Sequence, residues 1–438
     1  MPQAITKQSK IKFQSPKGMK DILPEEQKYW QFVSNIAEPL IQSYGFKKID
    51  TPILEETQLF AKGTGQTTDI VQKEMFSLRT KGGDQLSLRP EFTPNICRAY
   101  LEHGMNSLPQ PVKLYSFGPV FRYDRPQAGR LRQFNQFSIE AIGSKDPIID
   151  AQIIQLSWKI FEKLGLSKDL NIQINNIGCS KCRPGYIKLL VQYYKNKMRQ
   201  LCIDCKMRLN KNPLRLLDCK EAVCRRLMAD APQSVDNLCS ECHDHFKGVL
   251  EYLDELNLPY ELNYRLVRGL DYYTKTVFEF YPACNASRSD ACRPEPSFGG
   301  GGRYDSLIEI LGGKETPAVG VALGVERMIM EIEKQKIKII EQKKPRIFLA
   351  QLGTLSKRKA IKLFASLQQE GIKTAESFSH DSLKTQLRIA SRLEVDFTLI
   401  VGQKEALEES VILRDMSTGV QEVVLINKII PELKKRLK

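Results

Sequence analysis

Arginines gather in one short segment of the chain and give the first indication of chemistry. Arg122, Arg125, Arg130 and Arg132 surround a Pro-Gln-Ala-Gly turn, and the alternating polar and apolar residues after it end at Glu140. Such a turn can hold several guanidinium groups together, and these groups stay charged and match phosphate oxygens in geometry. The segment therefore predicts a polyphosphate ligand, a nucleic-acid backbone, or both.

Two further arginines and a glycine run stand elsewhere in the chain. Arg268 lies in a Leu-Val-Arg-Gly-Leu-Asp-Tyr-Tyr peptide, Arg327 ends a Gly-Val-Glu-Arg sequence, and residues 299–302 are all glycine. Glycine lets a backbone approach a ligand closely, although the run could also be a plain loop. The chain has neither a Gly-x-x-x-x-Gly-Lys-Ser/Thr loop nor a Rossmann glycine fingerprint between a strand and a helix. We therefore expect arginine side chains to hold any nucleotide, although a lone arginine is more often a surface ion-pair partner.

Cysteines form a second group with chemical potential. Eleven are present, and eight of them form four closely spaced pairs within 64 residues. Four such pairs could supply two tetrahedral zinc sites, or the thiols could be free and structural. The spacing leaves both readings open for Cys179, Cys182, Cys202, Cys205, Cys219, Cys224, Cys239 and Cys242.

Composition narrows the class of protein. The chain has 438 residues, a net charge of +15 and only four histidines. The positive charge favours an anionic partner, nucleic acid being the commonest, or else only keeps the protein in solution. No apolar run is long enough to cross a bilayer, and the Lys-rich first twenty residues lack the apolar core of a secretory signal. We expect a cytoplasmic protein whose chemistry relies on positioning and charge stabilisation more than on histidine catalysis.

The elements that must position these residues follow from periodicity. We expect a helix over residues 24–44 and a strand over 46–54, which Pro52 restricts to an edge or an interface. Strands over 113–123 and 133–142 flank the arginine turn. Antiparallel hairpins mixed with helices predict an α+β domain.

The rest of the chain divides by composition. We predict a catalytic domain over residues 1–174 and 259–335, interrupted by a Cys-rich helical insertion over 175–258. A strand is expected over 261–268 and a polar surface loop over 282–296. Alternating strands and helices over 345–438 predict a separate α/β domain.

Several of these peptides together resemble one family. The segment around Pro52, the arginine hairpin and the Arg327 peptide are similar to motifs 1, 2 and 3 of class II aminoacyl-tRNA synthetases. Two peptides resemble signatures of the histidyl-tRNA synthetases, and two more match the same family. The two signature peptides are residues 266–273 and 299–305, and the two further matches are residues 17–24 and 88–93. The resemblance implies an antiparallel sheet flanked by helices, a helical insertion that clamps the tRNA acceptor arm, and a C-terminal α/β anticodon-binding domain.

The resemblance also implies an activity and its partners. Histidine would react with ATP, accompanied by Mg²⁺, to give histidyl-adenylate and pyrophosphate. The histidyl group would then pass to the 3′-terminal adenosine of tRNA(His). Neither step needs a protein nucleophile, which agrees with the arginine-rich, histidine-poor composition. A homodimer is expected from the resemblance and from Pro52.

Residue roles carry over by the same resemblance. The catalytic residues would be Arg122 and Arg268. The residues expected to bind histidine are Glu91, Phe92, Thr93, Arg122, Gln136, Glu140, Arg268, Tyr272 and Tyr273. Those expected to bind ATP are Arg122, Asp124, Arg130, Phe134 and Arg327. Gln127 and Arg132 would contact the tRNA acceptor end. Glu140 and Tyr273 would hydrogen-bond the imidazole ring.

Two alternatives compete with this interpretation. A regulatory paralogue in histidine biosynthesis keeps the catalytic fold, but it lacks the anticodon-binding domain and has a degraded Arg-Gly-Leu-Asp-Tyr-Tyr peptide. A zinc-stabilised RNA-binding protein would account for the charge and the cysteines but leaves Glu140, Arg268 and Tyr273 unexplained. The chain departs from the family pattern at Phe298, where a cysteine is common, and at Asp124, where glutamate is frequent.

Overall fold

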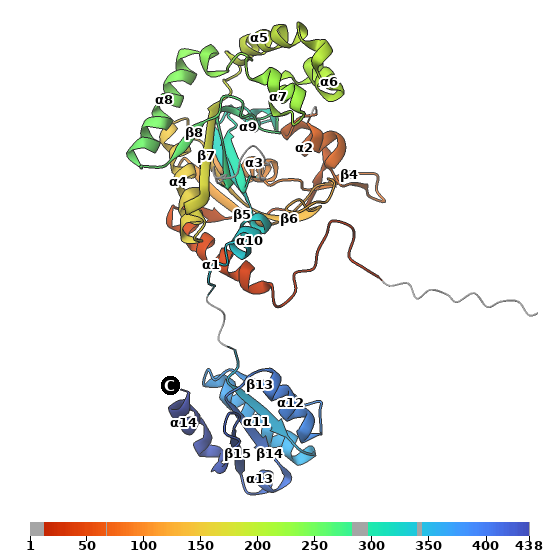
Figure 1. The fold of residues 1–438 in the computed structure, drawn as a ribbon, viewed down its shortest axis with the longest axis vertical. Helices are drawn as coiled ribbons and strands as arrows, with labels where there is room; N and C mark the ends of the chain where they lie inside the picture. Colours follow the sequence, from red (N-terminus) through yellow and green to blue (C-terminus); the bar gives the residue numbers. More distant parts are fainter. Residues whose placement is uncertain (1–12, 67, 283–296, 340–343, 438) are drawn as a thin grey trace, which may run out of the picture. The chain divides into compact units, whose positions relative to one another are not determined.

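The chain forms two compact units, residues 1–339 and 340–438. The computed structural model describes residues 13–66, 68–282, 297–339 and 344–437 (Figure 1). The predicted loop 282–296 falls, after its first residue, outside the described residues. No described helix is both long and apolar enough to cross a membrane.

An eight-stranded sheet forms the centre of the first unit, and only its two outermost pairs are parallel. The other five pairs are antiparallel, which confirms the α+β prediction. In spatial order the strands are β1 (Lys47–Lys48), β5 (Val112–Phe121), β6 (Gln133–Ile142), β11 (Ala318–Gly324), β10 (Gly299–Arg303), β9 (Thr274–Pro282), β7 (Leu170–Asn176) and β8 (Tyr260–Leu262).

Two predicted strands differ from the structure. The expected strand over 46–54 is divided into β1 and β2 (Leu54–Glu56), which belong to different sheets, with Pro52 between them. The expected strand over 261–268 ends with β8, because the Asn263 side chain accepts a hydrogen bond from the Arg265 amide and turns the backbone out of the sheet.

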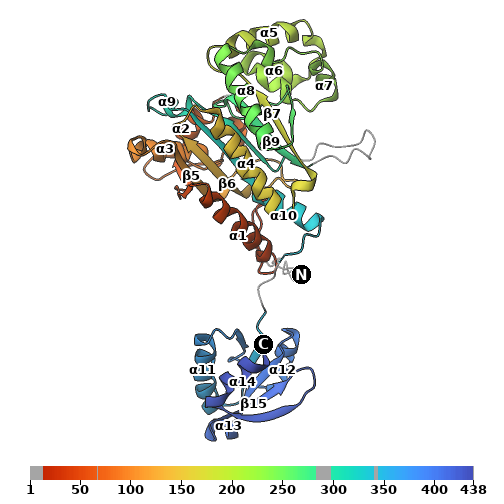
Figure 2. The same ribbon diagram turned by 90° about the vertical axis from the view of Figure 1, so that its left-hand side faces the viewer.

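One face of the large sheet is covered by helices. These are α1 (Gln27–Ser43), α4 (Pro147–Lys163), α8 (Ser240–Glu255) and α10 (Val325–Lys334), and Figure 2 shows α4 running along the sheet. Alternate residues of the strands point into this core, so Phe137, Ile139 and Ala141 of β6 are buried there. Their neighbours Gln136, Ser138 and Glu140 must therefore face the other side.

The opposite face carries the shorter elements and the cavity described below. Here lie α2 (Thr57–Gly63), the π-helical turn Ile70–Glu74, α3 (Thr93–Glu102) and α9 (Leu307–Ile310). A three-stranded sheet adjoins them, in the order β2, β4 (Gln85–Leu88) and β3 (Ser77–Arg79), and confirms the hairpin signal between residues 75 and 89.

The insertion is helical, as predicted. Figure 1 shows α5 (Arg183–Lys195), α6 (Ile203–Lys211) and α7 (Ala222–Met228) gathered at one end of the large sheet. They share a small core that includes Tyr186, Leu190 and Leu209. By contrast, α8 packs on α4, and its Val249 and Leu253 belong to the main core. The insertion boundaries 175 and 258 stay a prediction.

Short 3₁₀ turns connect several elements of the first unit. They are Met105–Ser107, Ser167–Asp169, Met198–Gln200, Pro213–Asp218 and Val235–Asn237.

The second unit is a five-stranded α/β domain. Its sheet has the order β13-β12-β14-β15-β16, with β12 parallel to both neighbours and the last two pairs antiparallel. The strands are β12 (Ile347–Gln351), β13 (Thr374–Glu376), β14 (Phe397–Val401), β15 (Ser410–Asp415) and β16 (Gln421–Leu425). The helices are α11 (Thr354–Gln369), α12 (Leu383–Arg392), α13 (Gln403–Leu407) and α14 (Ile426–Arg436).

Candidate active site

A cavity of about 570 Å³ opens on the face of the large sheet that carries the shorter elements. It is lined by strands β6, β9, β10 and β11, the start of α3, the arginine turn and part of the insertion. All thirteen residues expected to bind histidine or ATP line it, although they come from positions 91 to 327 of the chain. They are Glu91, Phe92, Thr93, Arg122, Asp124, Arg130, Phe134, Gln136, Glu140, Arg268, Tyr272, Tyr273 and Arg327.

Glu140 is a buried carboxylate surrounded by hydroxyl groups. Thr93 Oγ1 and Ser138 Oγ donate to Glu140 Oε1 at 2.8 and 2.7 Å, and Tyr304 OH donates to Oε2 at 2.6 Å. Burial raises the pKa of Glu140 from 4.5 to about 7, despite these three donors. Gly320 on β11 makes room for the group, because a Cβ there would lie 1.7 Å from Glu140 Oε2.

A second buried carboxylate, Glu91, lies in the same cavity. Thr64 Oγ1 donates to its Oε1 at 2.7 Å and Tyr272 OH to its Oε2 at 2.6 Å. Burial raises the pKa of Glu91 as well. Two partly satisfied acidic groups in one small space favour a ligand that carries hydrogen-bond donors or positive charge.

Arg268 lies in the loop before β9 and lines the cavity. Its guanidinium forms an ion pair with Glu279, a β9 residue that also accepts from Tyr281 OH. The Arg268 guanidinium carbon lies 5.5 Å from the centre of the Tyr273 ring. The Nε atom of Arg268 is buried and has no hydrogen-bond partner among the described residues. Arg268 therefore has a donor left for a ligand.

Three arginines from the two predicted phosphate-binding segments define the other side of the cavity. Arg122 Nε donates to the Pro90 carbonyl at 2.9 Å, which fixes its guanidinium 5.4 Å from the centre of the Phe134 ring. Arg130 pairs with Asp124 at 3.1 Å. Arg327 Nε donates to the Gly129 carbonyl at 2.9 Å, and burial together with the nearby positive charges lowers its pKa to about 10. Such a concentration of positive charge favours a polyanion.

The glycine run forms a central strand, β10, rather than a loop. A Cβ at Gly299 or Gly301 would lie 2.3 or 2.0 Å from a β11 carbonyl oxygen, and one at Gly302 would lie 2.4 Å from the β9 carbonyl of Thr276. The glycines are thus required by close strand packing on both sides. Gly299 and Gly300 also line the cavity, where the absence of side chains leaves room for a ligand.

Comparison with known proteins identifies the family. The family model described as "Histidyl-tRNA synthetase" matches residues 18–182 and 205–328, and the one described as "Anticodon binding domain" matches residues 347–436. A histidine–tRNA ligase of Dehalococcoides mccartyi is 45% identical over 425 residues, which span 97% of this chain and 100% of the relative.

The chain belongs to the histidyl-tRNA synthetase family. A further relative, the histidine–tRNA ligase of Desulforamulus reducens, is 43% identical and aligns with 96% of this chain and 99% of its own. The crystal structure of an apo histidyl-tRNA synthetase of S. aureus has a TM-score of 0.77 and 34% identity, covering 96% of this chain and 99% of that one. The match to an anticodon-binding domain counts against the regulatory paralogue, which is expected to lack one.

Two residues predicted from the family resemblance do not line the cavity. Gln127 exchanges backbone hydrogen bonds with Arg130 at the tip of the turn. The Arg132 guanidinium carbon lies 3.8 Å from the centre of the Tyr123 ring, and its Nε donates to the Asp124 carbonyl at 3.2 Å. Both residues lie in the arginine turn, outside the cavity lining.

Sequence reasoning missed several residues that the cavity requires. Tyr304 is part of the family's Gly-Gly-Gly-Gly-Arg-Tyr-Asp peptide, and that membership was the available signal for its contact with Glu140. Glu279 alternates with the buried Phe278 and Phe280 of β9, so its direction could have been read from the strand period. Thr64 carries no comparable signal, because only the fold brings it to Glu91.

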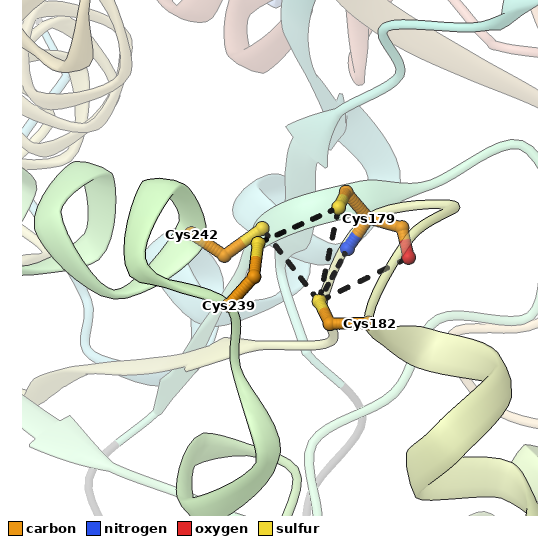
Figure 3. Close-up of side chains that lie close together, drawn as sticks. All are labelled: Cys179, Cys182, Cys239 and Cys242. Atoms are coloured by element: carbon orange, nitrogen blue, oxygen red, sulfur yellow. Dashed lines mark hydrogen bonds between the residues drawn. The ribbon is translucent and has the colours of Figure 1, made fainter.

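The eight paired cysteines form two separate clusters. The first cysteine cluster consists of Cys179, Cys182, Cys239 and Cys242 (Figure 3). The second cysteine cluster consists of Cys202, Cys205, Cys219 and Cys224. Within each cluster all four sulfur atoms lie within 4.8 Å of one another. All eight thiols are free, so no disulfide competes for them.

The sulfur spacing in both clusters fits a tetrahedral zinc ion. Bonds of about 2.3 Å from zinc to sulfur place the sulfurs about 3.8 Å apart. The Cys179 sulfur lies 3.7 Å from that of Cys182 and 3.9 Å from that of Cys239. In the second cluster the sulfurs of Cys202 and Cys219 are 3.8 Å apart. The donor set is therefore suited to zinc in both places.

Proposed function

We propose that this chain is a histidine–tRNA ligase. It activates L-histidine with ATP to histidyl-adenylate, releasing pyrophosphate, and transfers histidine to the 3′-terminal adenosine of tRNA(His). The observation that carries the proposal is the cavity itself, in which two buried carboxylates, Glu91 and Glu140, face a set of arginines. A cationic amino acid with two ring nitrogens suits the acidic side, and a triphosphate suits the basic side.

The acidic side binds histidine. Glu140 and Tyr273 bind the imidazole ring, while Glu91, Thr93 and Gln136 receive the α-ammonium group. One detail supports the second assignment, because the Oε1 atom of Gln136 is buried without a hydrogen-bond partner among the described residues. An ammonium donor would satisfy it. Phe92 and Tyr272 complete the pocket wall.

The basic side binds ATP. Arg130 and Arg327 hold the β- and γ-phosphates, and Phe134 stacks on the adenine ring. The histidine carboxylate attacks the α-phosphorus and pyrophosphate leaves, so negative charge builds on the phosphoryl oxygens. Arg122 and Arg268 stabilise that charge. Mg²⁺ bound to the ATP phosphates would supply further positive charge against the charge that builds there.

The second step needs the tRNA and further parts of the chain. Gln127 and Arg132, on the turn outside the cavity, are placed to meet the acceptor end, while Asp124 pairs with Arg130 beside them. The insertion holds the acceptor arm, and the C-terminal unit reads the anticodon. We further propose a homodimer, with Pro52 close to the interface, and a cytoplasmic location.

Both cysteine clusters hold structural zinc in this proposal. The support is the fit of the sulfur spacing to a zinc–thiolate tetrahedron. Backbone amides also face the sulfurs, as in Cys179 N to Cys182 Sγ at 3.3 Å, and such donors stabilise thiolates. Purification without chelator followed by elemental analysis should give two zinc ions per chain, and a value near zero would refute the assignment.

ATP–pyrophosphate exchange tests the proposed first step. Exchange should require histidine, and no other amino acid should replace it. Arg268→Ala should lower the exchange rate by about 100-fold or more while leaving histidine binding nearly unchanged, because it removes stabilisation of the transition state. Wild-type turnover in this variant would show that Arg268 has no catalytic role.

A further inference from the structure

The two cysteine clusters differ in their relation to the active site. The first cysteine cluster joins the residues after β7 to the start of α8, and none of its members lines the cavity. In the second cysteine cluster, Cys202 and Cys219 do line it. A metal ion at the second cluster would therefore be part of the cavity wall.

The second cysteine cluster closes a short loop of chain. Cys205 lies in the first turn of α6, and Cys219 directly follows the 3₁₀ turn Pro213–Asp218. Cys202 N donates to Cys224 Sγ at 3.4 Å, and this contact brings the start of α7 to the start of α6. One ion bound to all four sulfurs would fix the positions of these three elements relative to one another.

The residues inside this loop contact the loop that carries Arg268. Arg215 Nη2 pairs with Asp69 at 2.9 Å, and a Cβ on Gly269 would lie only 2.9 Å from Arg215 Nη1. Asn212 Nδ2 donates to Asp271 Oδ1 at 2.7 Å. The Arg215 guanidinium thus packs against the peptide that follows Arg268, and its side chain is 14% exposed.

Besides the cysteines, a small core and the ion pairs of Arg208 and Arg215 with Asp69 hold this segment in place. The core of the insertion buries Leu209, Leu216 and Leu217 next to the cysteines. It contains fewer buried residues than the main core. A core of this size gains much of its stability from a structural metal. The position of Arg215 should then depend on the ion.

We propose that the second cysteine cluster binds one zinc ion that positions Arg215 against Gly269 and Asp69, and thereby sets the pose of Arg268 for adenylate formation. Arg215 also lines the cavity, but in this proposal it is a positioning residue, since it acts through the Arg268 peptide. The catalytic consequence rests on the proposed function, whereas the metal site stands on the sulfur geometry alone.

Cys224→Ser tests the proposal without replacing a residue of the cavity lining, because Cys224 does not line the cavity. The variant should carry one zinc ion per chain where the wild type carries two. After replacement of zinc by Co²⁺, the cobalt–thiolate absorbance per chain should fall by about half. In histidine-dependent ATP–pyrophosphate exchange, kcat should fall by about 10- to 100-fold, since small misplacements of a catalytic group cost that much. The KM for histidine should change less than twofold.

Two further variants separate positioning from misfolding. Cys224→His keeps a zinc ligand and should restore both the second ion and most of kcat. Arg215→Met should keep two zinc ions and reproduce the loss of kcat. Two ions in Cys224→Ser would overturn the metal site, and full turnover in Arg215→Met would overturn the positioning role. If the wild type itself lacks exchange, the proposed function and the positioning role both fail, while the zinc counts still decide the metal site.

Discussion

Glu140 is a residue whose neutralisation should stabilise the protein and weaken histidine binding. The residue is 1% exposed, and burial raises the pKa of its carboxyl group from 4.5 to about 7. Between those two values the folded protein holds a proton that the unfolded chain releases, so the contribution of Glu140 to stability falls as pH rises through this window. Above pH 7 the cost is fully present and amounts to roughly 3 kcal/mol.

Glu140→Gln removes that cost while keeping the shape of the side chain. The amide oxygen can still accept from Thr93 and Ser138, and the Tyr304 hydroxyl can rotate to accept from the amide nitrogen. In urea denaturation, the variant should be more stable than the wild type by up to about 3 kcal/mol at pH 8. The difference should shrink toward zero near pH 5.

The same substitution should reduce histidine activation. A hydrogen bond to a charged group contributes about 1.5–3 kcal/mol, so kcat/KM for histidine in ATP–pyrophosphate exchange should fall by about 10- to 150-fold. Glu331→Gln is the matched control, because among the described residues the Glu331 side chain bonds to Lys334 and Gln335 at the end of α10, and Glu331 does not line the cavity. Unchanged histidine kinetics in Glu140→Gln, or a stability difference that is equal at pH 5 and pH 8, would refute the reasoning.

Two other substitutions test separate parts of the site, and a third tests a buried ion pair between α4 and β10 that does not line the cavity. Gly320→Ala places a Cβ 1.7 Å from Glu140 Oε2, so exchange assays should show at least a tenfold rise in the KM for histidine; an unchanged value would contradict the packing argument. Arg327→Lys loses the planar guanidinium that reaches the Gly129 carbonyl, so the KM for ATP should rise while that for histidine stays constant. Asp150→Ala breaks the buried ion pair with Arg303 and should cost about 3–5 kcal/mol in urea denaturation; a loss below 1 kcal/mol would show that the pair is dispensable.

Much of the site follows from sequence because it lies on regular strands. In β6 the alternation of Gln136 and Glu140 with buried apolar residues fixes which side chains face the cavity, and this period of two is visible in the sequence. The family motifs then supply roles that spacing alone cannot. Tyr304 belongs to a family motif, but the sequence gives it no role, because nothing local shows that its hydroxyl reaches the Glu140 carboxylate on β6.

The parts that sequence could not give depend on long-range packing. The cysteine pairs are visible by spacing, but spacing does not show that Cys179 meets Cys239 across 60 residues of chain. The glycine run could be a loop or a strand until the close approach of both neighbouring strands is known. Likewise, α8 has the composition of the insertion but packs on α4, since its apolar face matches the main core.

Aminoacylation tests the central claim most directly. The purified chain is incubated with ATP, Mg²⁺, total tRNA and each labelled amino acid in turn, and label on the 3′-terminal adenosine is measured. Only histidine should be transferred, only in the presence of ATP, and only to tRNA(His). A folded protein that charges no tRNA with histidine, or that charges tRNA equally well with another amino acid, would contradict the account.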